Sequence, residues 1–126
     1  MQDEPTPTEL VKAVADFLRN DIAPITSGHH AFKLRVAINA LDLVTRQLGL
    51  EQGSDAEEAK RLPPLLGVQG SLAELNRALS ESIANGEVDL QTPGLAEHLW
   101  QTTLAKLAVD QPNYAAYRRE LGRKSD

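Results

Sequence analysis

Three capping-box patterns, each followed by apolar residues at helical spacing, constrain the fold of this chain more than any other sequence feature. They begin at Thr6, Ser54 and Ser71, and each has a glutamate three residues later. In this pattern the hydroxyl and the carboxylate satisfy amide donors that the first turn of a helix leaves exposed. The apolar residues that follow recur every three or four positions, which builds one apolar stripe along a helix. We therefore predict an all-α fold.

The composition also agrees better with helices than with sheets. The chain has 19 leucines and 16 alanines, but 11 valines and isoleucines and five aromatic residues. Leucine and alanine favour helices, whereas β-branched and aromatic residues favour strands. Its 126 residues, 41% of them hydrophobic, fit one globular domain. We predict a compact bundle of about five or six helices in a single domain spanning residues 1–126, with residues 1–5 and 123–126 frayed.

Prolines and glycines predict where these helices end. Pro24, Gly49 and Gly122 act as stops, because proline disfavours helix in the residue before it and glycine commonly follows a helix. The Pro63-Pro64 step is expected to end or distort the third helix. We expect helices over about residues 7–22, 29–48, 54–62, 72–84, 93–109 and 114–121.

Some apolar residues also carry expectations about burial. Val88 and Leu90 belong to a segment too short to form a sheet alone, so we expect an extended connector with both side chains tucked inward. Trp100, Tyr114 and Tyr117 stand beside leucines at helical spacing. We interpret these aromatic residues as core, with an interaction surface as the alternative.

The charge balance excludes some classes of partner. Acidic residues outnumber basic ones by 18 to 13, so the net charge of -5 disfavours nucleic-acid binding. No stretch approaches the roughly 18 apolar residues of a membrane span, and the acidic residues 1–5 are unlike a signal peptide. The absence of cysteine fits a reducing compartment. We expect a cytoplasmic protein that binds neither nucleic acid nor membranes.

The most visible polar feature is a helix face formed by Arg35, Asn39, Asp42 and Arg46. Spacings of four, three and four residues place these side chains on one side of a helix. The arginines could bind an anionic ligand, or the face could hold a partner helix through charge-assisted hydrogen bonds. It could equally be a solvated ladder of ion pairs. We take the four residues as candidates for partner or ligand binding.

A second candidate segment runs from Lys106 through Asp110 to Tyr114. Here lysine precedes the acid by four residues, which is the less favourable order within a helix. We therefore interpret Asp110 as a helix terminator or N-cap. The simplest interpretation of the segment is a turn between two helices, and the alternative is a partner-facing surface.

No motif in the chain points to catalysis or to a metal. The adjacent His29 and His30 diverge by about 100° on a helix, and His98 is the one further histidine. No HExxH or ExxH pair supports zinc or a di-iron site. The sequence also lacks a GxSxG motif, a Walker loop and a GxGxxG motif. We expect no metal, no cofactor and no catalytic residue.

Three segments, residues 5–10, 32–41 and 106–114, resemble a small bacterial domain family of unknown function. That family is associated with aminoglycoside-phosphotransferase-like kinases and acyl-CoA dehydrogenases. The Pro63-Pro64 step departs from the smoother leucine-rich helix expected in the family. The resemblance supplies no active residues that could be carried over to this chain.

The resemblance implies a non-catalytic accessory or protein-interaction domain that partners a kinase-like protein near acyl-CoA metabolism. Under this hypothesis the Arg35 face and the segment from Lys106 to Tyr114 pack together or form the partner-facing surface. The competing hypothesis is a small-molecule binding protein, or a cryptic enzyme, that holds an anionic ligand with Arg35 or Arg46. An enclosed pocket at either arginine would favour that hypothesis. A homodimer is compatible with both.

Overall fold

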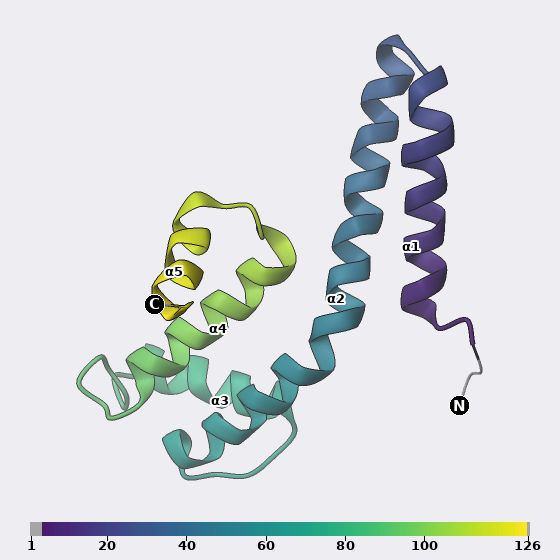
Figure 1. Cartoon of the computed structure of the whole chain (residues 1–126). Helices are drawn as coiled ribbons and strands as arrows, with labels where there is room; N and C mark the ends of the chain where they lie inside the picture. The colour runs from purple at the N-terminus through teal and green to yellow at the C-terminus, as the bar shows by residue number, and fades with distance from the viewer. Residues whose placement is uncertain (1–3, 126) are drawn as a thin grey trace. The chain divides into compact units, whose positions relative to one another are not determined.

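The computed structural model describes residues 4–125 and contains five α-helices and no strand within that range (Figure 1). The helices are α1 (Pro7–Phe17), α2 (Gly28–Leu66), α3 (Leu72–Ala84), α4 (Leu95–Asp110) and α5 (Ala115–Ser125). A π-helical turn, η1 (Leu18–Ile22), and a 3-10 turn, η2 (Ala23–Ile25), join α1 to α2. The all-α prediction is confirmed. The predicted fraying at residues 1–3 and 126 lies outside the described residues.

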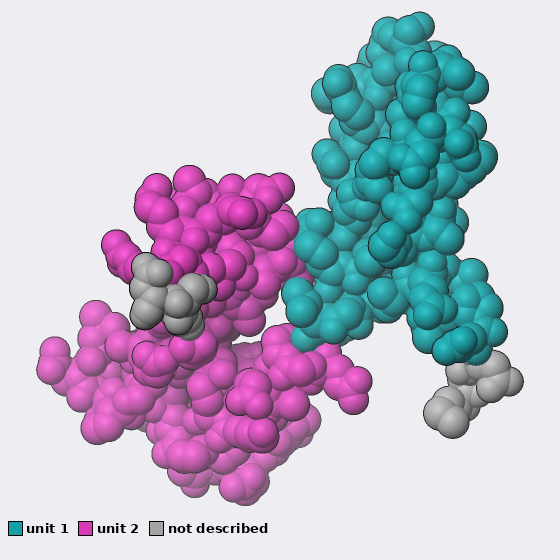
Figure 2. Space-filling model, viewed as in Figure 1, with its two compact units in different colours: residues 1–51 teal, residues 52–126 magenta. Residues whose placement is uncertain are grey.

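The chain divides into two compact units, unit 1 over residues 1–51 and unit 2 over residues 52–126 (Figure 2). The division falls inside α2, so this helix contributes to both units. The prediction of a single domain over residues 1–126 stays a prediction.

Two of the three predicted capping boxes are confirmed. At the start of α1, the Glu9 amide donates to Thr6 Oγ1 at 3.2 Å and the Thr6 amide donates to Glu9 Oε2 at 3.1 Å. At the start of α3, the Glu74 amide donates to Ser71 Oγ at 3.2 Å and the Ser71 amide donates to Glu74 Oε2 at 2.8 Å. Each pair satisfies two amide donors at a helix start, which fixes where these helices begin.

The third predicted capping box and the predicted stop at Gly49 are wrong, because α2 runs without a break through both positions. Gly49 and Gly53 keep helical backbone and face open space. A glycine inside a helix costs about 1 kcal/mol relative to alanine, and every further residue adds a hydrogen bond, so single glycines do not end this helix. Ser54 therefore lies inside the helix, where the amides that it would cap already bond to preceding carbonyl groups.

The Pro63-Pro64 step does not end α2, which continues to Leu66. The two prolines remove two amide donors, but they stand within the last four residues of the helix. The helix then closes with the Gly67 amide donating to the Pro63 carbonyl at 2.7 Å, and Gly67 has a φ of 72°. A left-handed glycine just beyond the last turn is a common helix ending.

Unit 1 is a helical hairpin in which α1 lies beside the first part of α2 (Figure 1). The seam between the two helices contains the buried Ala15 and Ile38, with the half-buried Val11, Leu18 and Leu34 around them. These side chains recur at three- and four-residue spacing on each helix, which keeps them on the facing sides.

The core of unit 2 is a leucine cluster built by α2, α3 and α4. Its buried members are Leu62, Leu75, Leu79 and Leu95. Half-buried side chains that pack against the cluster are Leu65, Leu66, Leu72 and Val88. Burial of these leucines on both sides of the Pro63-Pro64 step explains why α2 keeps its helical path there, since a buried leucine contributes about 1.5–3 kcal/mol.

Some predictions about burial and helix ends in unit 2 are corrected. Val88 packs inward as predicted, but Leu90 is 72% exposed. Trp100 and Tyr114 are also exposed, at 45% and 54%, so the core interpretation of these two is wrong. Gly122 lies inside α5, which continues to Ser125, so the predicted helix end at Gly122 is wrong, while fraying of residues 123–126 stays a prediction. Gly122 does not adopt the positive φ of a glycine stop.

Truncating the core leucine of α2 tests the packing of unit 2. Leu62 is fully buried, at 0% exposure. We expect Leu62→Ala to lower the free energy of unfolding by about 2–5 kcal/mol, measured by urea denaturation followed by circular dichroism. The exposed Leu90→Ala is the control and should stay within about 0.5 kcal/mol of the wild type. A similarly small change for Leu62→Ala would contradict the assignment of this residue to the core.

Candidate functional site

The predicted polar face of α2 lies in unit 1, and one of its residues, Asp42, forms an ion pair across the hairpin. Asp42 Oδ2 accepts a hydrogen bond from Arg19 Nη2 at 2.6 Å, which links η1 to α2. Arg35 and Asn39 are exposed, and Arg46 is half-buried. The structure therefore assigns a structural contact to Asp42 and leaves ligand or partner binding by the other three as a prediction.

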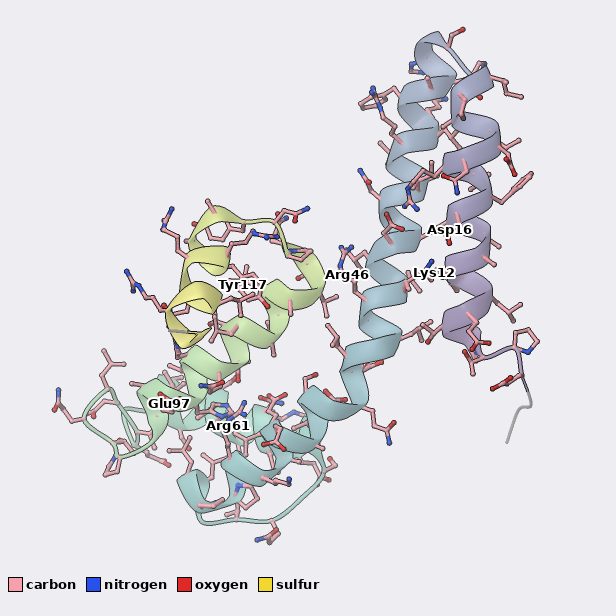
Figure 3. The ribbon with its side chains drawn as sticks, in the orientation of Figure 1. Lys12, Asp16, Arg46, Arg61, Glu97 and Tyr117 are labelled. Carbon is pink, nitrogen blue, oxygen red and sulfur yellow. The ribbon has the colours of Figure 1, made fainter. Side chains whose placement is uncertain are left out.

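Charged side chains beside the Arg19–Asp42 ion pair form a small network on one side of the hairpin. Asp16 accepts from Lys12 Nζ at 2.7 Å and from Arg19 Nη1 at 3.0 Å (Figure 3). The hydrogen bond from Lys12 is the main cause that lowers the pKa of Asp16. The hydrogen bond to Asp42 is the main cause that raises the pKa of Arg19. The side chains of these pairs are 34–65% exposed, so solvent screens them and each pair contributes little to stability.

The other side of the hairpin is apolar. Leu10, Val14 and Phe17 each stand one position before a seam residue of α1, and Val44 stands one position before the half-buried Thr45 of α2. In two antiparallel helices, residues that directly precede seam positions lie on the same side of the pair. We call this surface the apolar hairpin face. Its side chains, 41–52% exposed, are Leu10, Val14, Phe17, Val44 and Leu48.

The second predicted segment lies in unit 2 and is exposed. Asp110 is the last residue of α4, and Tyr114 directly precedes α5. Lys106, Asp110 and Tyr114 are all exposed. Asp110 lies at the end of the helix, while its role as a terminator and a binding role of the segment stay predictions.

Unit 2 contains a pocket that the sequence did not predict. Its volume is about 310 Å³, and its walls come from the last turns of α2 and from the start of α4. The residues that line it are Arg61, Pro64, Leu65, Pro93, Gly94, Glu97 and His98. The pocket is thus built from residues of one unit.

The start of α4 shapes one wall of this pocket. The sequence predicts that this helix begins at residue 93, but α4 begins at Leu95, and Thr92 Oγ1 accepts from the Asp89 amide at 2.9 Å in the preceding turn. The N-cap of α4 is Gly94, with a φ of 91° and no side-chain cap. A side chain at this φ is strained, so glycine allows the chain to turn from Pro93 directly into the helix.

Two polar side chains meet in the pocket. Arg61 Nε donates to His98 Nδ1 at 3.2 Å, and Arg61 Nη2 donates to Thr102 Oγ1 at 3.4 Å. His98 is 2% exposed, so nearly the whole ring lies inside the protein. Figure 3 places Arg61 on α2 and Glu97 on α4. The Oε1 atom of Glu97 accepts from Gln101 Nε2 at 2.7 Å.

Burial lowers the pKa of His98, and the neighbouring charge of Arg61 lowers it further, while Glu58 opposes the shift. The ring is therefore neutral near pH 7. Because Nδ1 accepts the hydrogen bond from Arg61, the ring proton resides on Nε2. The pocket thus holds a neutral histidine with an N–H donor beside a permanently charged guanidinium.

In the sequence, His98 belongs to no metal-binding motif, and Arg61 belongs to none of the predicted sites. The sequence pattern that indicates a buried His98 is the spacing of Leu95, His98 and Thr102. This spacing places the histidine on the inner face of its helix, beside a buried leucine. The structure describes no group of three or more potential metal-ligating histidine or carboxylate side chains within residues 4–125. In the same range, every helix is too short or too polar to cross a membrane.

The pKa of His98 predicts a pH dependence of stability. Above about pH 6.5, His98 is neutral in both the folded and the unfolded chain, so its contribution to stability is fully present. As the pH falls from there through the lowered pKa, the unfolded chain binds a proton that the folded chain disfavours, and stability is lost. We expect His98→Asn, which keeps an acceptor near Nδ1 but does not titrate, to lose less unfolding free energy than the wild type between about pH 7 and pH 5. Equal losses in urea denaturation would contradict this assignment.

Comparison with known proteins places most of the chain in one family. The matching family model is described as a domain of unknown function, DUF6285, and it covers residues 24–114. This range includes the whole pocket and two of the three segments that carry the resemblance, whereas residues 5–10 lie outside it. No curated protein and no solved structure matches the chain. The chain belongs to the DUF6285 family of unknown function.

Proposed function

We propose that this chain is a non-catalytic protein-interaction domain whose apolar hairpin face docks against a partner. The observation that carries this proposal is the placement of five large apolar side chains on one side of a two-helix hairpin, each 41–52% exposed. Apolar patches of this kind on soluble proteins commonly mark interaction sites. The charged network on the opposite side of the hairpin gives the two sides different chemistry.

The strength of the complex follows from the size of this face. Burying the exposed half of one such side chain contributes about 1 kcal/mol, so covering all five contributes on the order of 5 kcal/mol. Association itself costs several kcal/mol of lost translational and rotational freedom. The face alone therefore supports a weak, reversible complex, as an accessory domain requires.

For the partner, we propose an aminoglycoside-phosphotransferase-like kinase in the bacterial cytoplasm, working near acyl-CoA metabolism. The support for this identity is the resemblance carried by residues 32–41 and 106–114. A kinase-like partner with an apolar helical surface would cover the hairpin face. A second copy of this chain is the other candidate occupant, because a hairpin pair packed face to face makes a four-helix bundle.

A polar substitution of the hairpin face tests the proposal. We expect the double variant Val14→Ser/Phe17→Ser to recover at least about tenfold less of a kinase-like protein from native cell lysate than the wild type does, quantified by mass spectrometry. Its helical content should remain, because neither residue belongs to the hairpin seam. The matched control is Val68→Ser/Leu90→Ser, which replaces two exposed apolar residues of unit 2.

Equal recovery by the double variant and the control would refute the role of the hairpin face. Light scattering of the purified protein separates the two occupants. If the wild type is a dimer and the double variant is a monomer, a second copy of this chain covers the hairpin face, and this result would contradict the kinase as the partner. A monomeric wild type with face-dependent recovery of the kinase would support the proposed partner.

A further inference from the structure

Helix α5 gathers positive charge in a chain that is acidic overall. Residues 115–125 contain four basic side chains and one acidic side chain, a net charge of +3, whereas the whole chain has a net charge of -5. All other residues together therefore carry a net charge of -8. Positive charge that is concentrated on one short segment of an acidic protein attracts a partner of the opposite sign to that segment.

Two arginines of α5 keep their charge available. Arg118 and Arg119 are exposed, and the described side chains supply no carboxylate partner for either of them. Arg118 Nη1 donates instead to the neutral Asn113 Oδ1 at 3.5 Å. Arg123 differs, because its Nη1 lies 3.5 Å from Glu120 Oε2. Arg118 and Arg119 can therefore bind an anionic partner without breaking an ion pair among the described side chains.

Two apolar side chains lie beside these arginines. The Arg118 amide donates to the Tyr114 carbonyl at 3.0 Å, so Tyr114 belongs to the first turn of α5. Tyr114, Arg118 and Leu121 follow one another at spacings of four and three residues, which places them on one side of the helix. Tyr114 is 54% exposed and Leu121 is 43% exposed. We call Tyr114, Arg118, Arg119 and Leu121 the α5 surface.

The α5 surface combines the side chains that protein interfaces favour. Tyrosine and arginine are enriched among the residues that contribute most to binding. An arginine matches the planar geometry of a carboxylate and binds it through two parallel hydrogen bonds. The half-buried side chains of α5 lie on the other side of the helix, where they are Ala116, Tyr117 and Glu120. The α5 surface is therefore open to a partner without unpacking the helix.

The size of this surface and the charge of the rest of the chain indicate the class of partner. Tyr114 and Leu121 are about 10 Å apart along the helix, at 1.5 Å per residue. A long nucleic acid or an anionic membrane would extend beyond this distance, and the net charge of -8 on the other residues would repel it. A short protein segment can place a few carboxylates and one apolar side chain within the same distance.

We infer that the α5 surface binds a short acidic segment of a partner protein. Carboxylates of that segment accept hydrogen bonds from Arg118 and Arg119, and an apolar side chain of the segment lies against Tyr114 and Leu121. This surface lies in unit 2, so it is a second interaction surface that does not depend on the apolar hairpin face of unit 1.

A synthetic acidic peptide and the full-length wild-type protein test the inference without a variant. The probe is a peptide of about 12 residues that combines glutamates and leucines at helical spacing. We expect it to shift the backbone amide signals of residues 114–122 in NMR spectra, with a Kd on the order of 0.1 mM. The same peptide with glutamine in place of each glutamate should bind at least about tenfold more weakly. Equal binding of the two peptides, or shifts that leave out residues 114–122, would overturn the inference.

Charge-removing variants with a matched control locate the carboxylates. We expect Arg118→Gln/Arg119→Gln to weaken binding of the acidic peptide at least about tenfold. The helix should remain, because both side chains are exposed and glutamine favours helix. Lys33→Gln/Arg77→Gln removes two charges from exposed positions of α2 and α3 and should bind the peptide as the wild type does. Equal affinities of the arginine variant and this control would overturn the assignment of the arginines.

A further variant tests the apolar part of the α5 surface. We expect Tyr114→Ser, which keeps the backbone carbonyl that accepts from the Arg118 amide, to weaken binding of the acidic peptide at least about threefold. Unchanged affinity would overturn the assignment of Tyr114. Val14→Ser/Phe17→Ser should bind the peptide as the wild type does, and a loss of binding in this variant would place the peptide on the apolar hairpin face and overturn the inference.

Two other anionic partners serve as competing probes. A single-stranded oligonucleotide with the same net charge as the peptide, and vesicles that contain phosphatidylserine, should both bind at least about tenfold more weakly than the peptide does. Tighter binding of the oligonucleotide or of the vesicles at residues 114–122 would overturn the acidic protein segment as the partner.

Discussion

The core of unit 2 depends on α2 remaining helical through the Pro63-Pro64 step. A continuous helix fixes the register of its last turns, in which each residue is rotated by about 100° from the one before it. Leu62 then lies in the leucine core, and Arg61 is directed toward His98. A break at the two prolines would separate Leu62 from Leu65 and Leu66, which pack against the same leucine core.

Two arginines of this chain have different roles because their acceptors differ. Arg19 donates to the carboxylates of Asp16 and Asp42, so its charge is neutralised within the hairpin. Arg61 donates to His98 and to a hydroxyl, which are both neutral acceptors. The same charge helps to keep His98 neutral, and this leaves an N–H donor on the ring. Arginine thus links the two helices of the hairpin in unit 1 and helps to keep a buried histidine neutral in unit 2.

Local signals predicted the helical class and the helix starts at Thr6 and Ser71, because a capping box acts within one turn of the chain. The same pattern at Ser54 failed, since the residues before it were already helical and only the longer context shows this. The contact between Arg61 and His98 joins residues 37 positions apart and follows from the packing of α2 against α4. No local pattern specifies such packing, so the pocket could not be predicted from the sequence.

The continuity of α2 can be measured directly by amide hydrogen exchange. If α2 is one helix, the amides of residues 50–62 exchange at least about tenfold more slowly than in the unfolded chain, without a gap at residues 52–55. Exchange at the unfolded rate over residues 49–55, with protection on both sides, would mean that the helix is interrupted there. That result would contradict the account, because α2 would then be two helices, as the capping box at Ser54 predicts, and not one helix over Gly28–Leu66.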